Sequence, residues 1–343
     1  MERGGLGLSK SLKISRISII SSLTFLIPIT LTISISVGYA KIGFVEAFMA
    51  IFGNVEGLDS VSRAIILEIR FPRACAALLA GAVLAISGSV VQGALRNALA
   101  SPFTMGVSSG ASFGAALIIV AGVSSSIYVM MLSAFAFALL AALVSLGIAR
   151  LKGVTPQSLI LSGVAMMYLF SAGVTLLQYI AREWQLTELV YWTMGDLRRI
   201  DWGRFTFMLP AVFTCLPLFA YAWDLNTLMM GEEVAKSLGT NPRRVRTICT
   251  LLAALSTSII VCSTGPIGFI CLIAPHIARF LVGTDYRFSM VCSVLIGGLL
   301  LLLADTTARI VLMPIELPVG VVTAAMGVPF FVSLLLRTRK DIW

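Results

Sequence analysis

Long apolar stretches dominate this sequence and constrain its fold more than any other feature. A helix that spans a bilayer needs roughly 20 predominantly apolar residues, and about ten stretches of the chain come close to that length. Only 12% of the residues are charged, against about a quarter in an average globular chain. We therefore expect an all-α integral membrane protein. Its transmembrane helices are expected approximately at residues 17–38, 74–95, 103–121, 127–149, 158–180, 205–222, 247–263, 266–282, 290–304 and 318–336.

Proline and glycine interrupt several of these stretches, and some of the stretches are short. A bilayer tolerates such backbone only where neighbouring helices cover the freed polar groups. The expected fold is therefore a packed bundle of about ten helices in contact with membrane lipid. Because no long linker or low-complexity segment divides the chain, we expect residues 1–343 to form one membrane domain.

Lysines and arginines predict the orientation of this bundle. With ten spans and both termini in the cytoplasm, most of the 25 basic residues fall in cytoplasmic segments, as the positive-inside rule requires. The net charge of +9 is then a matter of topology and indicates no nucleic-acid partner. The first stretch follows four basic residues and ends in Gly38-Tyr39-Ala40, which also fits a cleaved signal peptide. Because it is long for such a peptide and further spans follow, we expect a retained helix.

Small residues recur at helical spacing in two of the predicted spans. Such repeats let helix backbones approach closely, so packing is the simplest interpretation. The run from Val107 to Ser112 also allows a second interpretation, a polar wall that faces a cavity. The recurring residues are Ala77, Gly81, Ala85, Ser89 and Gly93 in the second span and Gly106, Gly110 and Gly114 in the third.

Residues that build catalytic, metal or nucleotide sites are scarce. The sequence contains no G-x-x-x-x-G-K-[ST] loop for nucleotide phosphates. Its one histidine, His276, has no second histidine or carboxylate at ligand spacing, and no Ser/His/Asp set is recognisable. The six cysteines lie in or beside apolar spans without a C-x-x-C pair, which indicates packing residues. We expect neither an enzyme nor a bound metal or cofactor.

Arginines at the predicted outer ends of two spans need an explanation, because the positive-inside rule disfavours them there. Arg70 and Arg73 directly precede the second span, and Arg309 follows the ninth, in the predicted outer loop 304–309. Anchoring of the helix ends at lipid headgroups is one interpretation. Docking of a partner that carries carboxylates is the other.

Residues 232–246, EEVAKSLGTNPRRVR, form a charged stretch between two apolar spans on the predicted cytoplasmic side. Val234 and Leu238 lie four residues apart, on one face of a short helix. Gly239 suits the C-terminal cap of that helix, and Pro242 suits the start of a second short helix. Two short helices with a sharp corner are too small to be stable alone. We therefore expect this unit to pack against a soluble partner subunit.

Together with motifs elsewhere in the chain, this stretch resembles the iron-siderophore/cobalamin permease family, the membrane subunits of ATP-binding-cassette importers for iron chelates, haem and cobalamin. The resemblance covers about residues 65–340. One departure is Ala98, where the family often has a proline. The motifs, in order, are RFPR (70–73), LRNALASP (95–102), GVSSGA (106–111), GPIGF (265–269), PHIAR (275–279), AD (304–305) and ELPVGVVT (316–323).

The resemblance implies a type II importer bundle like that of the cobalamin importer permease. Two permease subunits, either two copies of this chain or this chain and a homologue, enclose a central path in that family. A pair of ATP-binding subunits lies on the cytoplasmic side and hydrolyses the ATP, and an extracytoplasmic substrate-binding protein docks on the other side. The resemblance also implies the plasma (inner) membrane of a bacterium or archaeon.

The resemblance also assigns roles to individual positions. Arg70, Arg73 and Arg309 match arginines that pair with glutamates of the binding protein. Asn97 and Leu99 match positions of a cytoplasmic gate. The coupling loop, at about residues 223–246, rests on the ATP-binding subunit in this family. Its matching residues are Glu233, Val234, Leu238, Gly239, Thr240, Asn241, Pro242 and Arg243.

The cargo is less constrained than the class of transporter. Ferric siderophore is expected because it is the family's most frequent cargo, and cobalamin, haem and oxyanions such as molybdate are alternatives. A proton- or ion-driven secondary transporter is the alternative from another class, but few ionisable residues lie within the spans. A permease of the other importer type has an E-A-A-x-x-x-G loop that Glu233 to Gly239 resembles. Ten spans rather than about six argue against that type.

Overall fold

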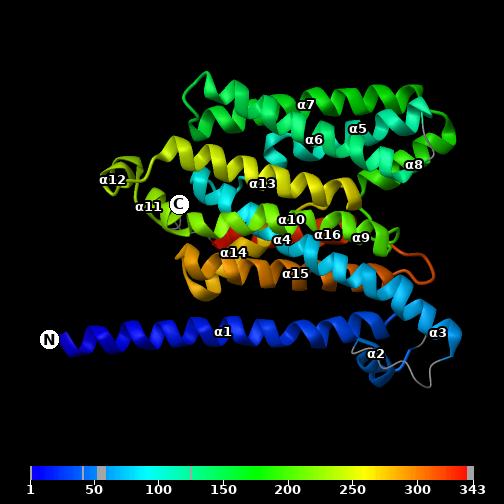
Figure 1. Ribbon diagram of the computed structural model, residues 1–343, viewed down its shortest axis with the longest axis horizontal. Coiled ribbons are helices and arrows are strands. Elements are labelled where there is room, and N and C mark those ends of the chain that lie inside the picture. Colours follow the sequence, from blue (N-terminus) through cyan, green and yellow to red (C-terminus); the bar gives the residue numbers. More distant parts are fainter. Residues whose placement is uncertain (1, 41, 52–58, 124–125, 338–343) are drawn as a thin grey trace.

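The computed structural model describes residues 2–40, 42–51, 59–123 and 126–337, and these residues form helices without a β-strand (Figure 1). Seven helical segments are long and apolar enough to cross a membrane, and three shorter apolar helices accompany them. The prediction of an all-α membrane protein with about ten spans is therefore confirmed. Part of the connection between the first two predicted spans, and the basic residues Arg339 and Lys340 near the end of the chain, lie outside the described residues.

Ten helical segments run back and forth along the long axis of the molecule (Figure 1). They are α1 (Glu2–Ser36), α4 (Phe71–Leu95), α5 (Val107–Ala121), α6 (Ile127–Arg150), α7 (Pro156–Ile180), the consecutive α9 (Trp202–Met208), α10 (Pro210–Cys215), η3 (Leu216–Tyr221) and α11 (Ala222–Met229), α13 (Pro242–Thr264), α14 (Ile270–Val282), α15 (Tyr286–Ile310) and α16 (Val319–Arg337). The shorter elements are α2 (Phe44–Ile51), α3 (Ser60–Ala64), η1 (Ile65–Arg70), η2 (Pro102–Met105), α8 (Glu183–Thr193) and α12 (Glu232–Ser237).

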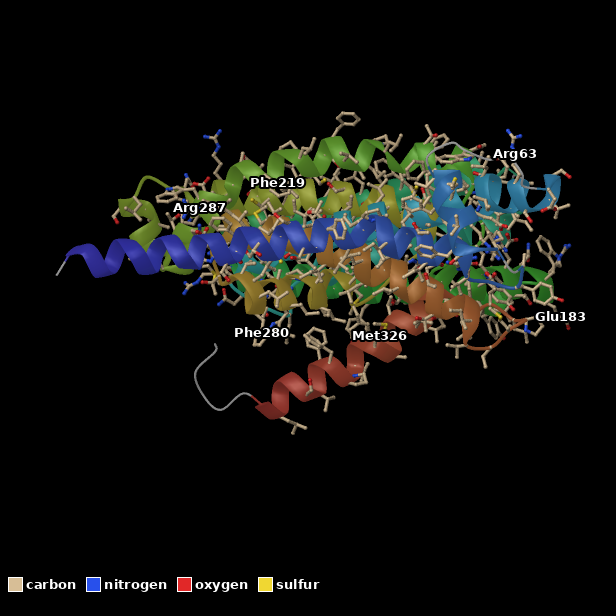
Figure 2. All side chains as sticks on the ribbon, turned by 90° about the horizontal axis from the view of Figure 1, so that it is seen from below. Arg63, Glu183, Phe219, Phe280, Arg287 and Met326 are labelled. Carbon is tan, nitrogen blue, oxygen red and sulfur yellow. The ribbon has the colours of Figure 1, made fainter. Side chains whose placement is uncertain are left out.

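The two ends of the bundle carry different elements. One end, called the α12 end here, holds α12 and the turns that follow α4, α6 and α14; the opposite end, the α8 end, holds α2, α3, α8 and the loop before α16. Helix α1 begins and α16 finishes at the α12 end (Figure 1), so the ten segments given above make ten crossings between the two ends. In Figure 2, α16 lies along the outside of the bundle and diverges from it.

Helix α4 lies at the centre of the bundle, and its small residues explain why. Gly81 and Gly88 are so close to neighbouring backbone that a Cβ at Gly81 would overlap the carbonyl of Gly297 on α15, and a Cβ at Gly88 that of Cys271 on α14. A Cβ at Gly93 would lie 2.5 Å from the hydroxyl of Tyr286. The small-residue stripe therefore sets the distance between α4 and its neighbours, and the packing interpretation of that stripe is confirmed.

Helices α5, α6 and α7 form a second layer, drawn along the top of Figure 1. Gly110 and Gly114 of α5 lie against the α6 backbone at Phe137 and Ser133. The Ser133 hydroxyl donates a 2.8 Å hydrogen bond to the Gly114 carbonyl. The glycines of the third predicted span thus serve the same purpose as those of α4.

Two segments that the sequence predicted as loops are helical. The RFPR motif at 70–73 joins η1 to α4, and residues 304–309 lie within α15. Pro72 has no N–H to donate, but it occupies the first turn of α4, directly after the π-helical turn of η1, where that loss is tolerated. Asp305 is buried within α15, where its carboxylate pairs with Arg73 and Arg309. The prediction of outer loops at these places was wrong.

Candidate functional site

The corner between α12 and α13 is closed by backbone hydrogen bonds. The amide of Thr240 donates to the carbonyl of Ala235 at 2.9 Å, and that of Gly239 donates to Lys236 at 3.0 Å. This pair of bonds is a Schellman cap, which needs a left-handed residue after the helix. Gly239 supplies it with φ +86°. The predicted role of Gly239 as the C-terminal cap is confirmed.

Residues after the cap start the next helix. Asn241 is the N-cap of α13, where its side-chain oxygen accepts a 3.1 Å hydrogen bond from the amide of Arg244, and Pro242 is the first helical residue. The buried Thr240 hydroxyl bonds to Asp224 at 3.0 Å and to Thr227 at 2.9 Å, both on α11. The expected second short helix is absent, because apolar residues continue the helix that Pro242 opens into the long span α13.

The tip of this corner exposes apolar side chains. Val234 and Leu238 are 43% and 54% exposed, and Met230 is 67% exposed, whereas Ala235 of α12 is fully buried. Glu233 is also exposed and forms a 2.8 Å ion pair with Lys236. Exposed apolar side chains rimmed by charges are typical of a protein–protein contact surface.

Arg246 ties the corner to the centre of the bundle. Its Nε donates to the carbonyl of Ala94 on α4 at 3.0 Å, and its Nη2 lies 2.5 Å from Glu232 on α12. The hydrogen bond from Arg246 lowers the pKa of Glu232, so this carboxylate is ionised at neutral pH. The sequence reasoning missed Arg246. The available signal was an arginine at the first turns of an apolar span, where a buried charge needs a partner.

A second site lies beside this corner, in the cavity between α12 and the α6–α7 turn. It is about 570 Å³ in volume, and its lining includes Gly153, Thr155, Asn241 and Arg243. A Cβ on Gly153 would lie 3.3 Å from Nη2 of Arg243. The predicted coupling residues therefore contribute to both a protruding tip and an adjoining hollow.

The two predicted gate residues form a tight turn after α4 at the α12 end. Asn97 accepts a 2.9 Å hydrogen bond from the amide of Leu99 through its side-chain oxygen, and its own amide donates to the carbonyl of Gln92 at 3.0 Å. The Asn97 side chain thus fixes the turn although Ala98 replaces the family's proline. Leu99 is 53% exposed at the tip.

At the α8 end, the arginines predicted for docking form a buried network. Arg73 contacts both carboxylate oxygens of Asp305 at 2.9 and 3.1 Å through Nε, and Glu316 at 2.7 Å through Nη1. Arg309 lies 3.4 Å from the same Asp305 and donates to the carbonyl of Ser34 at 2.9 Å. Arg70 donates to carbonyls of the end of α1 and the following residues, at 2.7 Å to Ile35 and 2.7 Å to Ala40.

This network lies where the sequence predicted it, but the side chains point inward. Arg70, Arg73 and Arg309 are 7%, 5% and 5% exposed. Asp305 and Glu316 and the backbone carbonyls near the end of α1 satisfy these side chains inside the bundle. Their contact with a docking partner stays a prediction.

A hydroxyl-lined cavity of about 530 Å³ lies between α5 and α7. Ser108, Ser109 and Ser112 of α5 line it. They belong to the run that the sequence analysis offered as a polar wall, and this interpretation is confirmed. Ser171, Thr175 and Gln178 of α7, and Thr193 of α8, also line the cavity.

The chain is similar over nearly its whole length to known transport proteins. Residues 26–337 match the FecCD transport family. A Methanocaldococcus jannaschii protein named as an ABC transporter permease is 44% identical over 321 residues, which are 90% of this chain and 91% of that protein. The Fe(3+)-citrate import system permease protein of Bacillus subtilis is 38% identical over 296 residues, covering 85% of this chain and 88% of the relative.

A solved structure supports the same relation. It is described as an inward-facing conformation of a metal-chelate type ABC transporter, and it matches 94% of this chain and 99% of its own chain with a TM-score of 0.83 and 33% sequence identity. The chain therefore belongs to the FecCD transport family.

Proposed function

We propose that this chain is the permease subunit of an ATP-binding-cassette importer and moves a ferric chelate, most simply a ferric siderophore, across a plasma membrane. The observation that carries the proposal is the capped α12 corner, which projects Val234 and Leu238 from the bundle while Arg246 holds its base on α4. An ATP-binding subunit is the partner that such a corner serves in an importer.

The corner supplies a path from ATP to the membrane helices. Coupling requires that ATP binding interacts differently with the two states of the permease. Closure of a pair of ATP-binding subunits against α12 displaces α13, which begins at Pro242, and α4, which Arg246 contacts. The turn at Asn97 and Leu99 directly follows α4, so we place the cytoplasmic gate there. In this assignment the α12 end and both termini are cytoplasmic.

The α8 end then faces outward and receives a substrate-binding protein. We assign to Arg70, Arg73 and Arg309 a supporting role in this docking, because they fix α1, α4 and α15 relative to one another from inside the bundle. Reversal of these three charges is a poor test of docking, since it would also break the buried network.

The translocation path requires a second permease subunit, either another copy or a homologue. The hydroxyl-lined cavity between α5 and α7 opens on the surface of this chain. Polar side chains at membrane depth are tolerated where they face protein or water, not lipid. We therefore place the partner subunit over α7, with the hydroxyl-lined cavity on the path between them.

Ferric chelates are favoured by the similarity to an Fe(3+)-citrate permease and to a metal-chelate type transporter. Hydroxyl and amide groups without formal charge suit a bulky cargo that the binding protein has already selected. Cobalamin, haem and oxyanions are the alternative cargoes. An ATP-independent secondary transporter is the alternative from another class, and the α12 corner has no role in it.

The test is uptake into proteoliposomes that contain this chain with its ATP-binding subunits and its substrate-binding protein. The proposal predicts that radiolabelled ferric siderophore accumulates only when ATP and the binding protein are both present. Accumulation without the ATP-binding subunits would overturn the importer assignment. ATP hydrolysis that the binding protein stimulates without movement of iron would retain the class and replace the cargo.

A further inference from the structure

Asn226 joins α11 to the turn between α14 and α15 at the α12 end of the bundle. Its side-chain amide donates a 2.9 Å hydrogen bond to Oδ1 of Asp285, the N-cap of α15. Its side-chain oxygen accepts a 2.9 Å hydrogen bond from the backbone amide of Tyr286. One side chain thus binds two consecutive residues that lie 59 and 60 positions away in the sequence. This pair of hydrogen bonds is called the α11 clasp here.

The chemistry of the two partners determines how the Asn226 amide is oriented. Hydrogen bonds from Arg287 and Asn226 lower the pKa of Asp285 to about 2, so this carboxylate is ionised at neutral pH. An ionised carboxylate only accepts hydrogen bonds, and the backbone amide of Tyr286 only donates one. The NH₂ group of Asn226 therefore faces Asp285, and its oxygen faces Tyr286. The hydrogen bond to an ionised acceptor is the stronger of the two.

Helix α11, which carries Asn226, also holds the corner between α12 and α13. The buried Thr240 hydroxyl bonds to the Asp224 carboxylate at 3.0 Å and to the Thr227 hydroxyl at 2.9 Å. These two partners flank Asn226 in the sequence of α11. A displacement of the corner therefore displaces α11, and Asn226 moves with it.

The α14–α15 turn, at the other side of the clasp, packs on the last turns of α4. The Tyr286 hydroxyl lies so close to Gly93 that a Cβ there would be 2.5 Å from it. Arg279, in the last turn of α14, donates a 2.6 Å hydrogen bond to the side-chain oxygen of Gln92. The backbone carbonyl of Gln92 accepts the amide of Asn97 at 3.0 Å. The contacts of the α14–α15 turn thus reach the turn in which we place the gate.

We infer that Asn226 is a positioning residue for coupling and that the α11 clasp makes α14 and α15 move with the corner. The inference rests on the proposed function and adds to it a second route, because Arg246 contacts α4 directly from α13. Energetic coupling is carried by contiguous hydrogen-bonded and packed groups of this kind. Without the clasp, the corner moves while α14 and α15 stay behind. ATP hydrolysis then continues, and less cargo is moved for each ATP.

The first experiment exchanges the two side chains of the clasp and measures siderophore uptake per ATP hydrolysed in the proteoliposomes. Asn226→Asp removes the donor and places a second carboxylate beside Asp285, so the contact becomes repulsive. Asn226→Asp/Asp285→Asn restores a donor and an acceptor in exchanged positions, and asparagine is as good an N-cap as aspartate. We expect the ratio to fall about tenfold in the single variant and to recover most of its wild-type value in the exchanged one.

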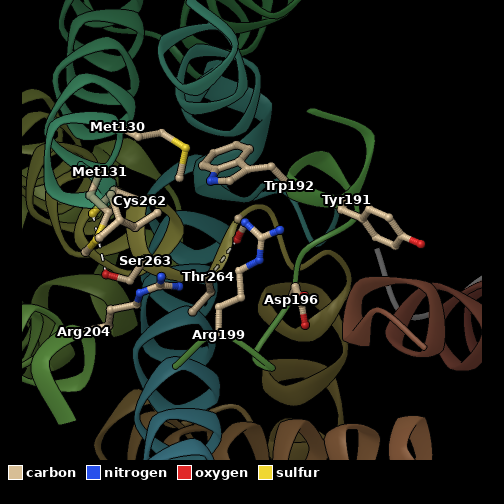
Figure 3. A pocket seen from close by; sticks show the side chains of 12 residues that line it. Met130, Met131, Tyr191, Trp192, Asp196, Arg199, Arg204, Cys262, Ser263 and Thr264 are labelled. Atoms are coloured by element: carbon tan, nitrogen blue, oxygen red, sulfur yellow. Dashed lines mark hydrogen bonds between the residues drawn. The ribbon is translucent and has the colours of Figure 1, made fainter. Parts of the chain in front are cut away.

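The ratio of uptake to ATP hydrolysis separates coupling from folding, because loss of folded complex lowers both rates in proportion. Arg287→Gln is the matched control. It removes the other side-chain partner of Asp285, which is 59% exposed at the α12 end (Figure 2), and Asp285 stays ionised at the ordinary pKa of an aspartate. Ser263→Ala is the distant control, since Ser263 lines a small cavity at the opposite end of α13 (Figure 3). Both variants should keep the wild-type ratio.

The second experiment replaces the clasp by a covalent link that is made and broken in one sample, so folding is the same in both states. Asn226→Cys/Asp285→Cys is joined by a short bifunctional thiol reagent that a reductant cleaves. We expect the linked protein to take up more siderophore per ATP than the same protein after cleavage. Equal ratios in the two states would contradict the inference.

The inference and the proposed function fail in distinguishable ways. If Asn226→Asp kept the wild-type ratio, or if the exchanged variant stayed as low as the single one, the α11 clasp would have no part in coupling. The importer assignment would then stand, because the wild-type protein still takes up siderophore with ATP. Absence of ATP-dependent uptake by the wild-type protein would overturn both.

Discussion

At the scale of single residues, Asp305 holds the α8 end together. It is fully buried within α15 and contacts both Arg73 on α4 and Arg309 one helical turn along its own helix. Glu316 contacts Arg73 as well, but 37% of its side chain is exposed. Two carboxylates with three arginines leave the network with an excess of positive charge. Removal of the buried carboxylate, Asp305, should therefore destabilise the protein more than removal of the partly exposed one.

Asp305→Asn is therefore expected to lower the free energy of unfolding by about 3–5 kcal/mol, the cost of leaving a buried charge without its partner. Unfolding of the purified protein in detergent by denaturant measures this. Glu316→Gln is the control, with an expected loss of at most about 1 kcal/mol, because its carboxylate is partly hydrated. Equal losses in the two variants would contradict the distinction between them.

Gly239 allows a second prediction at this scale. Its φ of +86° disfavours a side chain, although a Cβ there meets no neighbouring atom. Gly239→Val therefore strains the backbone of the corner without a clash, at a cost of about 1–2 kcal/mol. We expect siderophore uptake per ATP hydrolysed to fall at least tenfold, with unchanged protein in the membrane by immunoblot.

Gly239→Asn is the matched variant, because asparagine tolerates the left-handed conformation. It should retain most of the uptake. If valine and asparagine at this position behaved alike, backbone conformation at the corner would have no part in coupling.

At the scale of elements, close backbone contacts position α4 among its neighbours. Gly88 faces the backbone of Cys271, so an added methyl group has no flexible side chain to displace. By contrast, Gly147 on α6 is exposed and has no atom within 4 Å of its would-be Cβ. Two helical glycines in one chain thus differ only in what surrounds them.

Gly88→Ala is expected to destabilise the protein by about 1–3 kcal/mol, as overpacking of a well-packed core does. Gly147→Ala is expected to stabilise it by about 0.5–1 kcal/mol, because alanine loses less conformational freedom in a helix than glycine does. Thermal unfolding in the same detergent compares them. A stabilising alanine at position 88 would show that α4 and α14 are not held in close contact.

The positions of most helices were predicted correctly from the sequence. Apolar length and small-residue spacing located the ten spans, and Gly239 with Pro242 located the end of α12 and the start of α13. Helix continuation through RFPR and through residues 304–309 was missed, and so was the pairing that lets these charged residues be buried, because Arg73 and Asp305 lie 232 positions apart in the sequence. Asn226 was not singled out either, since only the fold brings it beside Asp285.

At the scale of the whole molecule, ten crossings place the α5–α6 loop and the α6–α7 turn at opposite ends of the bundle. Val123 and Leu151 occupy these connections and are 71% and 83% exposed. Native cysteines give little background in labelling experiments, since five of the six are buried and Cys75 is partly buried.

A membrane-impermeant maleimide should therefore label Val123→Cys in intact cells. Leu151→Cys should be labelled only after permeabilisation, because the α12 end is assigned to the cytoplasm. Labelling in the reverse order would invert the proposed orientation and place the α12 corner where no ATP-binding subunit can reach it.

Arg246 has a mechanical consequence for the molecule as a whole. Its guanidinium touches α12 through Glu232 and the last turn of α4 through Ala94, and the Asn97 turn begins three residues later. A displacement of the corner thus reaches that turn through one side chain at the membrane surface, without passing along the length of any helix. In the proposed importer, these two contacts of Arg246 would link a movement of the ATP-binding subunits directly to the cytoplasmic mouth.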